Sequence, residues 1–280
     1  MKTAHVCSVL LILMNNSAAL AQSIEFFEEN PQILYTNKPS QVAVGDFDQD
    51  GQPDLVKLTE VPGQLTVQWG QGLGKFGAET CLNELNFPAL LGPTMTLVDD
   101  LNGDGRPDVF VVQHDSAKIS IYLNLGQQAF GCRVKWERQD VATGPYPRYL
   151  ALADFNLDGL KDLATGGFGH AVYVQLNKGM NGAKWVFSSP QGLLLNFVNG
   201  INGLITADLD ADGRTDIGLI SGNLNPGFRV LWNFPPATPG GPIQWQPETF
   251  PNFQGTTPNA IRAAEFNNDG QMDVAVTYSH

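Results

Sequence analysis

Basic residues are scarce in this chain. Its 280 residues include 16 Lys and Arg against 28 Asp and Glu, which gives a formal net charge of −12. A nucleic-acid partner is therefore excluded, because phosphate binding needs a basic face. Charged residues make up only 16% of the chain, below the roughly 25% that is typical of folded domains. With 42% hydrophobic and 10% aromatic residues, the chain has the composition of a folded protein and not of a disordered one.

Long apolar stretches are also missing. A membrane-spanning helix needs about 20 consecutive apolar residues, and the apolar run from Val6 to Met14 is much shorter. This run follows Lys2 and precedes Ala19-Leu20-Ala21, which has the form of a cleavage signal. We expect residues 1–21 to be a signal peptide cleaved after Ala21. Residues 22–280 would then be a secreted or periplasmic protein without a transmembrane segment.

Cysteine and histidine are rare. One of three cysteines falls in the expected signal peptide, and the spacing of Cys81 and Cys132 fits no zinc or redox motif. These two either form a disulfide or are small, half-buried apolar residues. Apart from the last residue, the mature chain has only His114 and His170. We expect both in exposed loops on one face, where they could approach each other. No G-x-S-x-G or H-E-x-x-H motif is present.

A repeated acidic pattern dominates the sequence. Five segments read acid-x-[Asp or Asn]-x-Asp-Gly-x-x-Asp, and their starts at 46, 100, 154, 208 and 265 are 54, 54, 54 and 57 residues apart. We number them loop 1 to loop 5 and count positions from the first acid. Positions 1, 3, 5 and 9 are Asp46, Asp48, Asp50 and Asp54 in loop 1; Asp100, Asn102, Asp104 and Asp108 in loop 2; Asp154, Asn156, Asp158 and Asp162 in loop 3; Asp208, Asp210, Asp212 and Asp216 in loop 4; and Glu265, Asn267, Asp269 and Asp273 in loop 5.

This spacing predicts a site for a hard cation in each loop. Side-chain oxygens at positions 1, 3 and 5 converge when the chain turns tightly, and the glycine at position 6 permits the turn. The carboxylate at position 9 closes the shell. We expect position 7 to contribute its backbone carbonyl, whatever its side chain. The residues at position 7 are Gln52, Arg106, Leu160, Arg214 and Gln271.

The donor set favours Ca²⁺, with up to five ions in the protein. Six or seven oxygens suit Ca²⁺ better than Mg²⁺, which prefers a smaller octahedron and retains water. Zinc would require His or Cys, which these loops lack. The five loops hold 17 of the 28 acids, so the net charge of the protein is concentrated where cations would neutralise it.

An EF-hand is the obvious alternative, and the sequence excludes it. An EF-hand loop needs Glu at position 12, where this chain has Lys57, Val111, Thr165, Leu219 and Val276. The flanking residues also have the pattern of strands. We expect strand–loop–strand hairpins such as those from 42–44 to 55–56, from 150–153 to 163–164, and from 204–205 to 217–219.

A second element follows each of the first four loops. It comprises Leu65–Gly70, Ile119–Asn124, Val172–Asn177 and Phe228–Asn233, each with an aromatic residue downstream. With this element, the segments resemble FG-GAP or VCBS repeats, a family of calcium-loop β-propeller blades similar to those of integrin α-subunit heads. The resemblance implies an all-β protein in which each repeat is a four-stranded blade with the calcium loop between strands one and two.

Under this resemblance, residues 22–280 form one β-propeller of four complete blades plus a partial fifth. The repeats lie near 41–94, 95–148, 149–202, 203–259 and 260–280. A strand near Phe26 has the spacing of an outer strand, because it precedes Asp46 as Trp245 precedes Glu265. Either this strand pairs with the last hairpin and closes the ring, or the chain is a fragment or short form of a longer propeller. Open strand edges would then be available for pairing with another chain.

Two classes of function remain open. The first is a binding or adhesion module for a glycan or an extracellular protein, with calcium as scaffold. The second is a polysaccharide-active enzyme of the lyase type, or an accessory domain of one, because some such enzymes resemble this architecture. A closed calcium shell leaves no position for substrate, unlike a catalytic metal. We therefore expect no enzymatic activity.

A ligand site is expected on the face opposite the calcium loops, where the connections vary most. Aromatic rings there can stack on a sugar, and polar groups can bind its hydroxyls. Tyr146, Phe168 and His170 belong to adjacent connections, so we expect them to form one patch. Such aromatic residues could instead fill the space between blades.

Overall fold

The computed structural model describes residues 40–59, 63–73, 75–77, 90–127, 133–169, 171–182, 184–194, 200–221, 227–236, 242–250 and 257–279. They belong to the compact unit Leu34–His280. All regular structure in this part of the chain is β-strand. None of it is a helix that could span a membrane.

The strands form successive antiparallel sheets, as the resemblance predicts. Blade 1 contains three described strands, blades 2, 3 and 4 contain four each, blade 3 adds a two-stranded extension, and a two-stranded hairpin follows. The strands are β1 (Gln41–Gly45), β2 (Asp54–Thr59) and β3 (Gln64–Gln68) in blade 1; β4 (Pro93–Asp99), β5 (Asp108–Gln113), β6 (Lys118–Gln127) and β7 (Val134–Ala142) in blade 2; β8 (Pro147–Ala153), β9 (Asp162–Gly167), β10 (Ala171–Gln175) and β13 (Gln191–Leu194) in blade 3, with β11 (Asn177–Asn181) and β12 (Lys184–Phe187) as its extension; β14 (Ile201–Ala207), β15 (Asp216–Ser221), β16 (Gly227–Phe234) and β17 (Gln244–Phe250) in blade 4; and β18 (Thr257–Ala264) and β19 (Asp273–Ser279) in the last hairpin.

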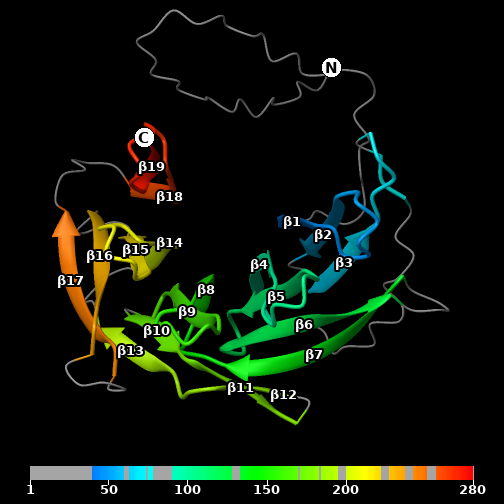
Figure 1. Ribbon diagram of the computed structural model, residues 1–280, viewed down its shortest axis with the longest axis horizontal. Helices are drawn as coiled ribbons and strands as arrows, with labels where there is room; N and C mark the ends of the chain where they lie inside the picture. The colour runs from blue at the N-terminus through cyan, green and yellow to red at the C-terminus, as the bar shows by residue number, and fades with distance from the viewer. Residues whose placement is uncertain are drawn as a thin grey trace, which may run out of the picture. The chain divides into compact units, whose positions relative to one another are not determined.

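Neighbouring blades pack through their first strands, as in a β-propeller. Contacts link β1 to β4, β4 to β8, β8 to β14 and β14 to β18, and Figure 1 shows these strands on the inner side of their sheets. The second strands lie inside a sheet and between two blades. Every residue of β5, β9 and β15 is therefore buried, which is why Val109–Val112 reads as an unbroken apolar run.

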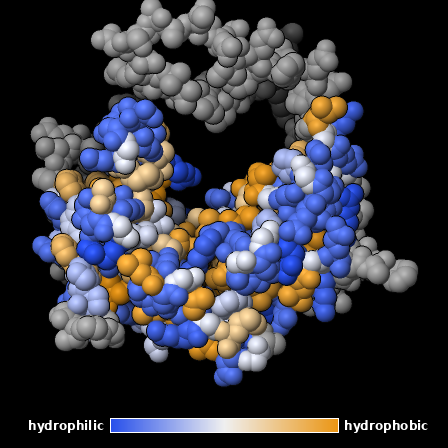
Figure 2. Space-filling view, in the orientation of Figure 1, coloured by the Kyte–Doolittle hydropathy of each residue, from blue (hydrophilic) through white to orange (hydrophobic). Residues whose placement is uncertain are grey.

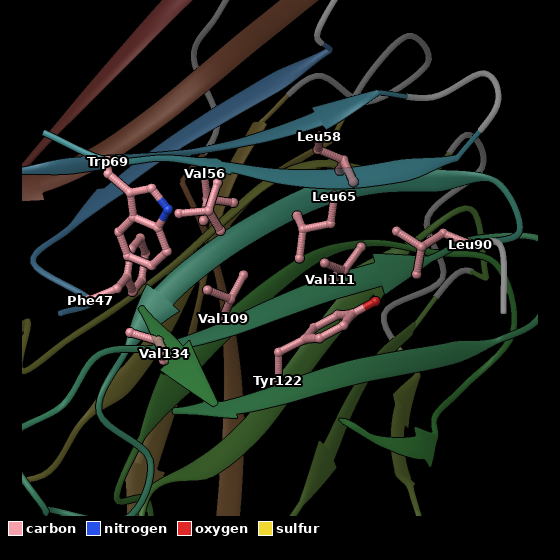
Figure 3. Packing of buried hydrophobic residues seen from close by; sticks show 11 residues of the cluster. Phe47, Val56, Leu58, Leu65, Trp69, Leu90, Val109, Val111, Tyr122 and Val134 are labelled. Carbon is pink, nitrogen blue, oxygen red and sulfur yellow. The ribbon is translucent and has the colours of Figure 1, made fainter. Parts of the chain in front are cut away.

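The apolar core fills the spaces between blades. Between blades 1 and 2, Val56 and Leu58 of β2 meet Val109 and Val111 of β5, and Trp69 covers one end of the cluster (Figure 3). A separate cluster joins blades 3 and 4, and a smaller one joins blade 4 to the last hairpin. On the face that Figure 2 shows, polar residues are interspersed with apolar patches. Blades 2, 3 and 4 thus bury both sheet faces against their neighbours, whereas blade 1 and the last hairpin each have one neighbour among the described residues.

One predicted strand is interrupted. We expected Val172 to Asn177 to be continuous, but β10 ends at Gln175 and β11 begins at Asn177. Between them, the Leu176 N–H donates to the Ser188 hydroxyl at 2.8 Å, and the Ser188 N–H donates to the Leu176 carbonyl at 2.8 Å. A side-chain hydroxyl thus replaces one bond of the ladder, and the outer half of blade 3 becomes the hairpin β11–β12.

Several predictions concern residues outside the described ranges. These are the signal peptide, the strand near Phe26, the pair Cys81 and Cys132, and His170. The fourth strand expected in blade 1, after Gly77, falls there as well. The partial fifth blade is confirmed as the hairpin β18–β19. On the edge strand β1, Val42 and Val44 are exposed, and pairing of this edge with another chain stays a prediction.

Candidate metal-binding loops and the opposite face

All five acidic loops have the same frame of strands. In each, the first strand ends one residue before position 1, and position 9 is the first residue of the second strand. Loop 1, for example, runs from the end of β1 at Gly45 to the start of β2 at Asp54. The predicted strand–loop–strand hairpin is therefore confirmed for every loop. The ligand positions have the same place relative to the strand ends in all five loops.

Backbone N–H groups point inward at the carboxylates of each loop. In loop 3, the Asp158 N–H donates to Oδ1 of Asp154 and to Oδ1 of Asn156, both at 3.1 Å. The Gly159 N–H donates to Asp154 Oδ2 at 2.7 Å, and the same three bonds recur in the other loops. The turn requires a left-handed backbone at position 6, where Gly159 has φ 86°. These bonds hold the side chains of positions 1 and 3 beside each other.

The carboxylate at position 9 is the buried anchor of the loop. In loop 3, Asp162 is fully buried. Its Oδ2 accepts the Phe155 N–H at 3.0 Å and its Oδ1 accepts the Asn177 N–H at 2.7 Å. Asp54, Asp108 and Asp216 are buried in the same way. Asp273 of loop 5 is half-buried and accepts the Phe266 N–H at 2.9 Å.

Burial destabilises the ionised form of these position 9 aspartates. It raises the pKa of Asp108 and of Asp162 to about 6, although two backbone N–H groups lower the pKa of each. The neighbouring carboxylates of the same loop raise these pKa values further. The pKa values of Asp54 and Asp216 are also raised, mainly by burial. A cation between the acids would oppose both effects, because it attracts the ionised form.

The donor positions fit a metal ion in loops 1 and 4. The carboxylate oxygens of Asp46, Asp48 and Asp54 lie within 4.8 Å of one another, and so do those of Asp208, Asp210 and Asp216. Two oxygens bound to one Ca²⁺ at about 2.4 Å can be at most about 4.8 Å apart. These two clusters could therefore share one ion each. In loops 2, 3 and 5, position 3 is an asparagine, which offers an amide oxygen in place of the carboxylate.

An asparagine clamp behind the loops was not anticipated. Asn124 and Asn233 end the second element of blades 2 and 4, and each is buried. The Asn233 side-chain amide donates to the Phe155 carbonyl of loop 3 at 2.8 Å and to the Thr215 carbonyl at 3.1 Å. Asn124 makes the equivalent bond to Phe47 of loop 1 at 2.8 Å. Each clamp thus ties a loop to the next blade. The asparagine that recurs at the end of the second element could have indicated this clamp from the sequence.

An aromatic contact repeats beside each clamp. Phe47, at position 2 of loop 1, packs edge-on against Trp136 of β7 with ring centroids 5.5 Å apart. Phe155, at position 2 of loop 3, packs in the same way against Trp245 of β17 at 5.5 Å. The recurring downstream tryptophans therefore cover the loop of the preceding blade. Loop position and blade packing are coupled through these rings.

The side chain at position 7 also acts on the loop, which we did not expect. Arg106 donates from Nε to the Asn124 carbonyl at 2.9 Å and pairs with Asp104 of its own loop. Arg214 makes the same bonds to the Asn233 carbonyl, at 2.6 Å, and to Asp212. In loops 2 and 4, the arginine at position 7 therefore places a cation beside the aspartate at position 5. Loop 3 has Leu160 at position 7 and lacks this cation.

The opposite ends of the strands present an aromatic cluster. His114 follows β5, whose six residues span about 20 Å from loop 2. Its ring centroid lies 5.4 Å from that of Tyr146 and 5.8 Å from that of Phe168. Tyr146 is 56% exposed and Phe168 46% exposed, so these rings do not plug the space between blades. The structure thus places two members of the expected patch against His114, while His170 lies outside the described residues.

Fold and loops together define a class of protein: a β-propeller built from repeats with an acidic loop between the first two strands of each blade. Two overlapping segments, residues 100–165 and 154–219, match the model of the FG-GAP-like repeat. Residues 100–219 of the chain therefore contain FG-GAP-like repeats. Each matched segment begins at position 1 of an acidic loop, Asp100 or Asp154.

Comparison with other proteins finds similar solved structures, including two of one protein complex, and no curated relative. No curated protein matches this sequence. The crystal structure of BBS1N in complex with ARL6DN, soaked with mercury, is similar at a TM-score of 0.42 and 14% identity, over 87% of this chain and 78% of that chain. The same complex soaked with lead gives a TM-score of 0.40 at 14% identity, over 87% of this chain and 76% of that chain. Likenesses this weak carry no argument about function.

Proposed function

We propose that this FG-GAP repeat protein is a secreted or periplasmic calcium-binding propeller that acts as a binding module for a glycan or an extracellular protein. One observation carries the proposal. The five loops at one end of the strands share one frame and one hydrogen-bond pattern, whereas the connections at the other end differ and expose aromatic rings. A constant scaffold with a variable opposite end is typical of recognition proteins.

Calcium is the ion that the donor sets fit best. The candidate ligands are carboxylate, amide and backbone oxygens, which suit Ca²⁺ and exclude the His and Cys chemistry of zinc. Asp46, Asp48 and Asp54 would hold an ion in loop 1, and Asp208, Asp210 and Asp216 would hold one in loop 4. Loops 2, 3 and 5 would bind through Asn at position 3, which gives up to five ions in all.

The role of calcium in this proposal is structural. When bound, it supplies positive charge between buried and half-buried acids. The position 9 aspartates keep the two strands of each hairpin in register through their bonds to backbone N–H groups. The asparagine clamps connect loops 1 and 3 to the following blade. A stiff loop therefore stiffens the contact between blades and, through the strands, the opposite end.

Enzymatic activity is the alternative, and the described residues favour it less. Lyase or hydrolase chemistry needs a positioned base or acid near the substrate. Among the described residues at the aromatic cluster, the candidates are His114 and the adjacent Asp115, whose Oδ1 is 2.9 Å from His114 Nδ1. Cleavage of an acidic polysaccharide that is lost in His114→Ala would establish an enzyme in place of a binding module.

Binding to immobilised ligands tests the proposed function. The calcium-loaded protein should bind members of a glycan array or a panel of extracellular proteins. The double variant Tyr146→Ala, Phe168→Ala should lose at least about tenfold in affinity, because truncation of two exposed contact rings removes roughly 1–2 kcal/mol or more.

Leu73→Ala is the matched control for this experiment. Leu73 is 99% exposed and lies in the turn after β3, away from the aromatic cluster. This variant should bind as the wild type does. Ligand binding that is unchanged in the double variant would place the site elsewhere, and no binding by the folded, calcium-loaded protein would contradict the proposal.

A further inference from the structure

A small pocket lies between blades 2 and 3, beside the aromatic cluster. Its volume is about 200 Å³, less than the roughly 300 Å³ at which sites for drug-sized ligands begin. It therefore has room for a single small unit. Its lining comes from the starts of β4 and β8 and from the segments after β5 and β9. The lining residues are Gly92, Thr94, His114, Asp115, Arg148 and Phe168.

Arg148 gives the pocket an unused cation. Its guanidinium lies over the ring of Phe168, with its carbon 4.8 Å from the ring centroid. It has no carboxylate or carbonyl partner among the residues that the structure describes. A half-buried guanidinium normally finds an anion or several acceptors, because it has five donors. The contact with the ring holds the guanidinium beside the pocket and leaves its donors for a ligand.

His114 and Asp115 form the other side of the pocket. The His114 backbone N–H donates to the Gly92 carbonyl at 2.9 Å, and its ring contacts those of Tyr146 and Phe168. Its Nε2 is buried and has no hydrogen-bond partner within the described part of the chain. The Asp115 side chain is 65% exposed, so its carboxylate can accept hydrogen bonds from ligand hydroxyls.

Tyr146 is held in a strained backbone conformation at the rim. Its φ is 52°, which is unusual for a bulky residue. Its carbonyl accepts the Phe168 N–H at 3.2 Å, and a Cβ at Gly167 would lie 2.0 Å from this carbonyl oxygen. The contact therefore requires glycine at 167. Strain of this kind collects at functional sites, and here it presents an exposed aromatic ring.

We propose that this pocket binds an acidic sugar. The carboxylate of a uronic acid would pair with Arg148, its apolar face would stack on Tyr146 and Phe168, and its hydroxyls would donate to Asp115. One guanidinium with one acid at the rim suits a single negative charge better than a dense polyanion. This inference rests on the proposed function, because it names the ligand class of the same face.

Three matched sugars test the inference on the calcium-loaded protein. They are methyl glucuronoside, its methyl ester and methyl glucoside, and dissociation constants come from saturation-transfer NMR titrations. The acid should bind at least about tenfold more tightly than the ester, because the ester cannot make a charge-assisted pair. Arg148→Gln should weaken the binding of the acid until it equals that of the ester, and so remove this preference. Tyr146→Ala should weaken the binding of all three sugars.

Lys118→Gln is the charge control. Lys118 lies outside the pocket, on the β5–β6 hairpin that also carries His114 and Asp115. Its Nζ is 3.9 Å from Asp140 Oδ2. This variant should keep the preference for the acid, and all variants should melt at the temperature of the wild type. Equal binding of acid and ester, or a preference that survives Arg148→Gln, would overturn the inference.

Two further probes separate acidic sugars from other anions. Tighter binding of blocked aspartate amide than of the glucuronoside would overturn the assignment in favour of an acidic peptide. Tighter binding of a sulfated glucoside would overturn the uronic acid. If none of the probes binds while array binding still depends on Tyr146 and Phe168, the inference fails and the proposed function stands. If both experiments are negative, both fail.

Discussion

Removal of calcium should destabilise the protein by roughly 7 kcal/mol. Sites of the extracellular type bind Ca²⁺ at about 10⁻⁴ M, so about 1 mM Ca²⁺ contributes roughly 1.4 kcal/mol per site. Five loops of one design then give a sum comparable with the total stability of a typical domain. Urea unfolding with excess EDTA, compared with unfolding in 1 mM Ca²⁺, measures the difference.

Magnesium provides the control for this experiment. At the same concentration, Mg²⁺ should restore little of the lost stability, because it prefers a smaller octahedral shell and retains water. An unfolding curve that is indifferent to EDTA would contradict a structural role for calcium. Equal restoration by Mg²⁺ would contradict the selectivity that the oxygen sets predict.

Asp162→Ala should be the most damaging single substitution in loop 3, at about 3–6 kcal/mol in calcium. The change removes an acceptor from two buried N–H groups, those of Phe155 and Asn177. Each unsatisfied group costs about 1–3 kcal/mol, and the calcium contribution of the site is lost as well. Chemical unfolding in 1 mM Ca²⁺ gives the change in the free energy of unfolding.

Asp158→Ala separates the two causes. Asp158 is at position 5 of the same loop and is exposed, so its loss weakens the ion site without stripping the buried N–H groups. We expect a loss of only about 1–2 kcal/mol. With EDTA present, the cost of Asp158→Ala should nearly vanish and most of the cost of Asp162→Ala should remain. Equal losses for the two variants would show that position 9 has no anchoring role.

Local spacing made the loops and their strands predictable. Ligand positions 1, 3, 5 and 9 lie within nine residues, so the sequence shows them directly, and the apolar runs beside them indicate strands. The register that starts β2 at Asp54 and β5 at Asp108 follows from the same nine residues. The break at Leu176 was missed because the Ser188 hydroxyl that replaces the ladder bond is 12 residues away.

Contacts between blades were harder to predict. The clamp from Asn233 to the Phe155 carbonyl spans 78 residues, and nothing local indicates which carbonyl the amide reaches. The patch shows the same limit. Tyr146 and Phe168 were expected to lie together because their connections are adjacent, but the contact of both rings with His114 of the preceding blade was not predicted. The contact of the Arg148 guanidinium with the Phe168 ring likewise joins β8 to the segment after β9 and has no local signal in the sequence.

Direct counting of bound calcium tests whether the five acidic loops are metal sites. Metal-free protein is dialysed to equilibrium against about 1 mM Ca²⁺, and bound ions per chain are measured. Loops of one design with affinities near 10⁻⁴ M predict close to five ions, with one fewer in Asp154→Ala. Calcium binding by the loops would be contradicted if the folded protein bound no more calcium than a control protein without such loops. It would also be contradicted if Asp154→Ala bound as many ions as the wild type.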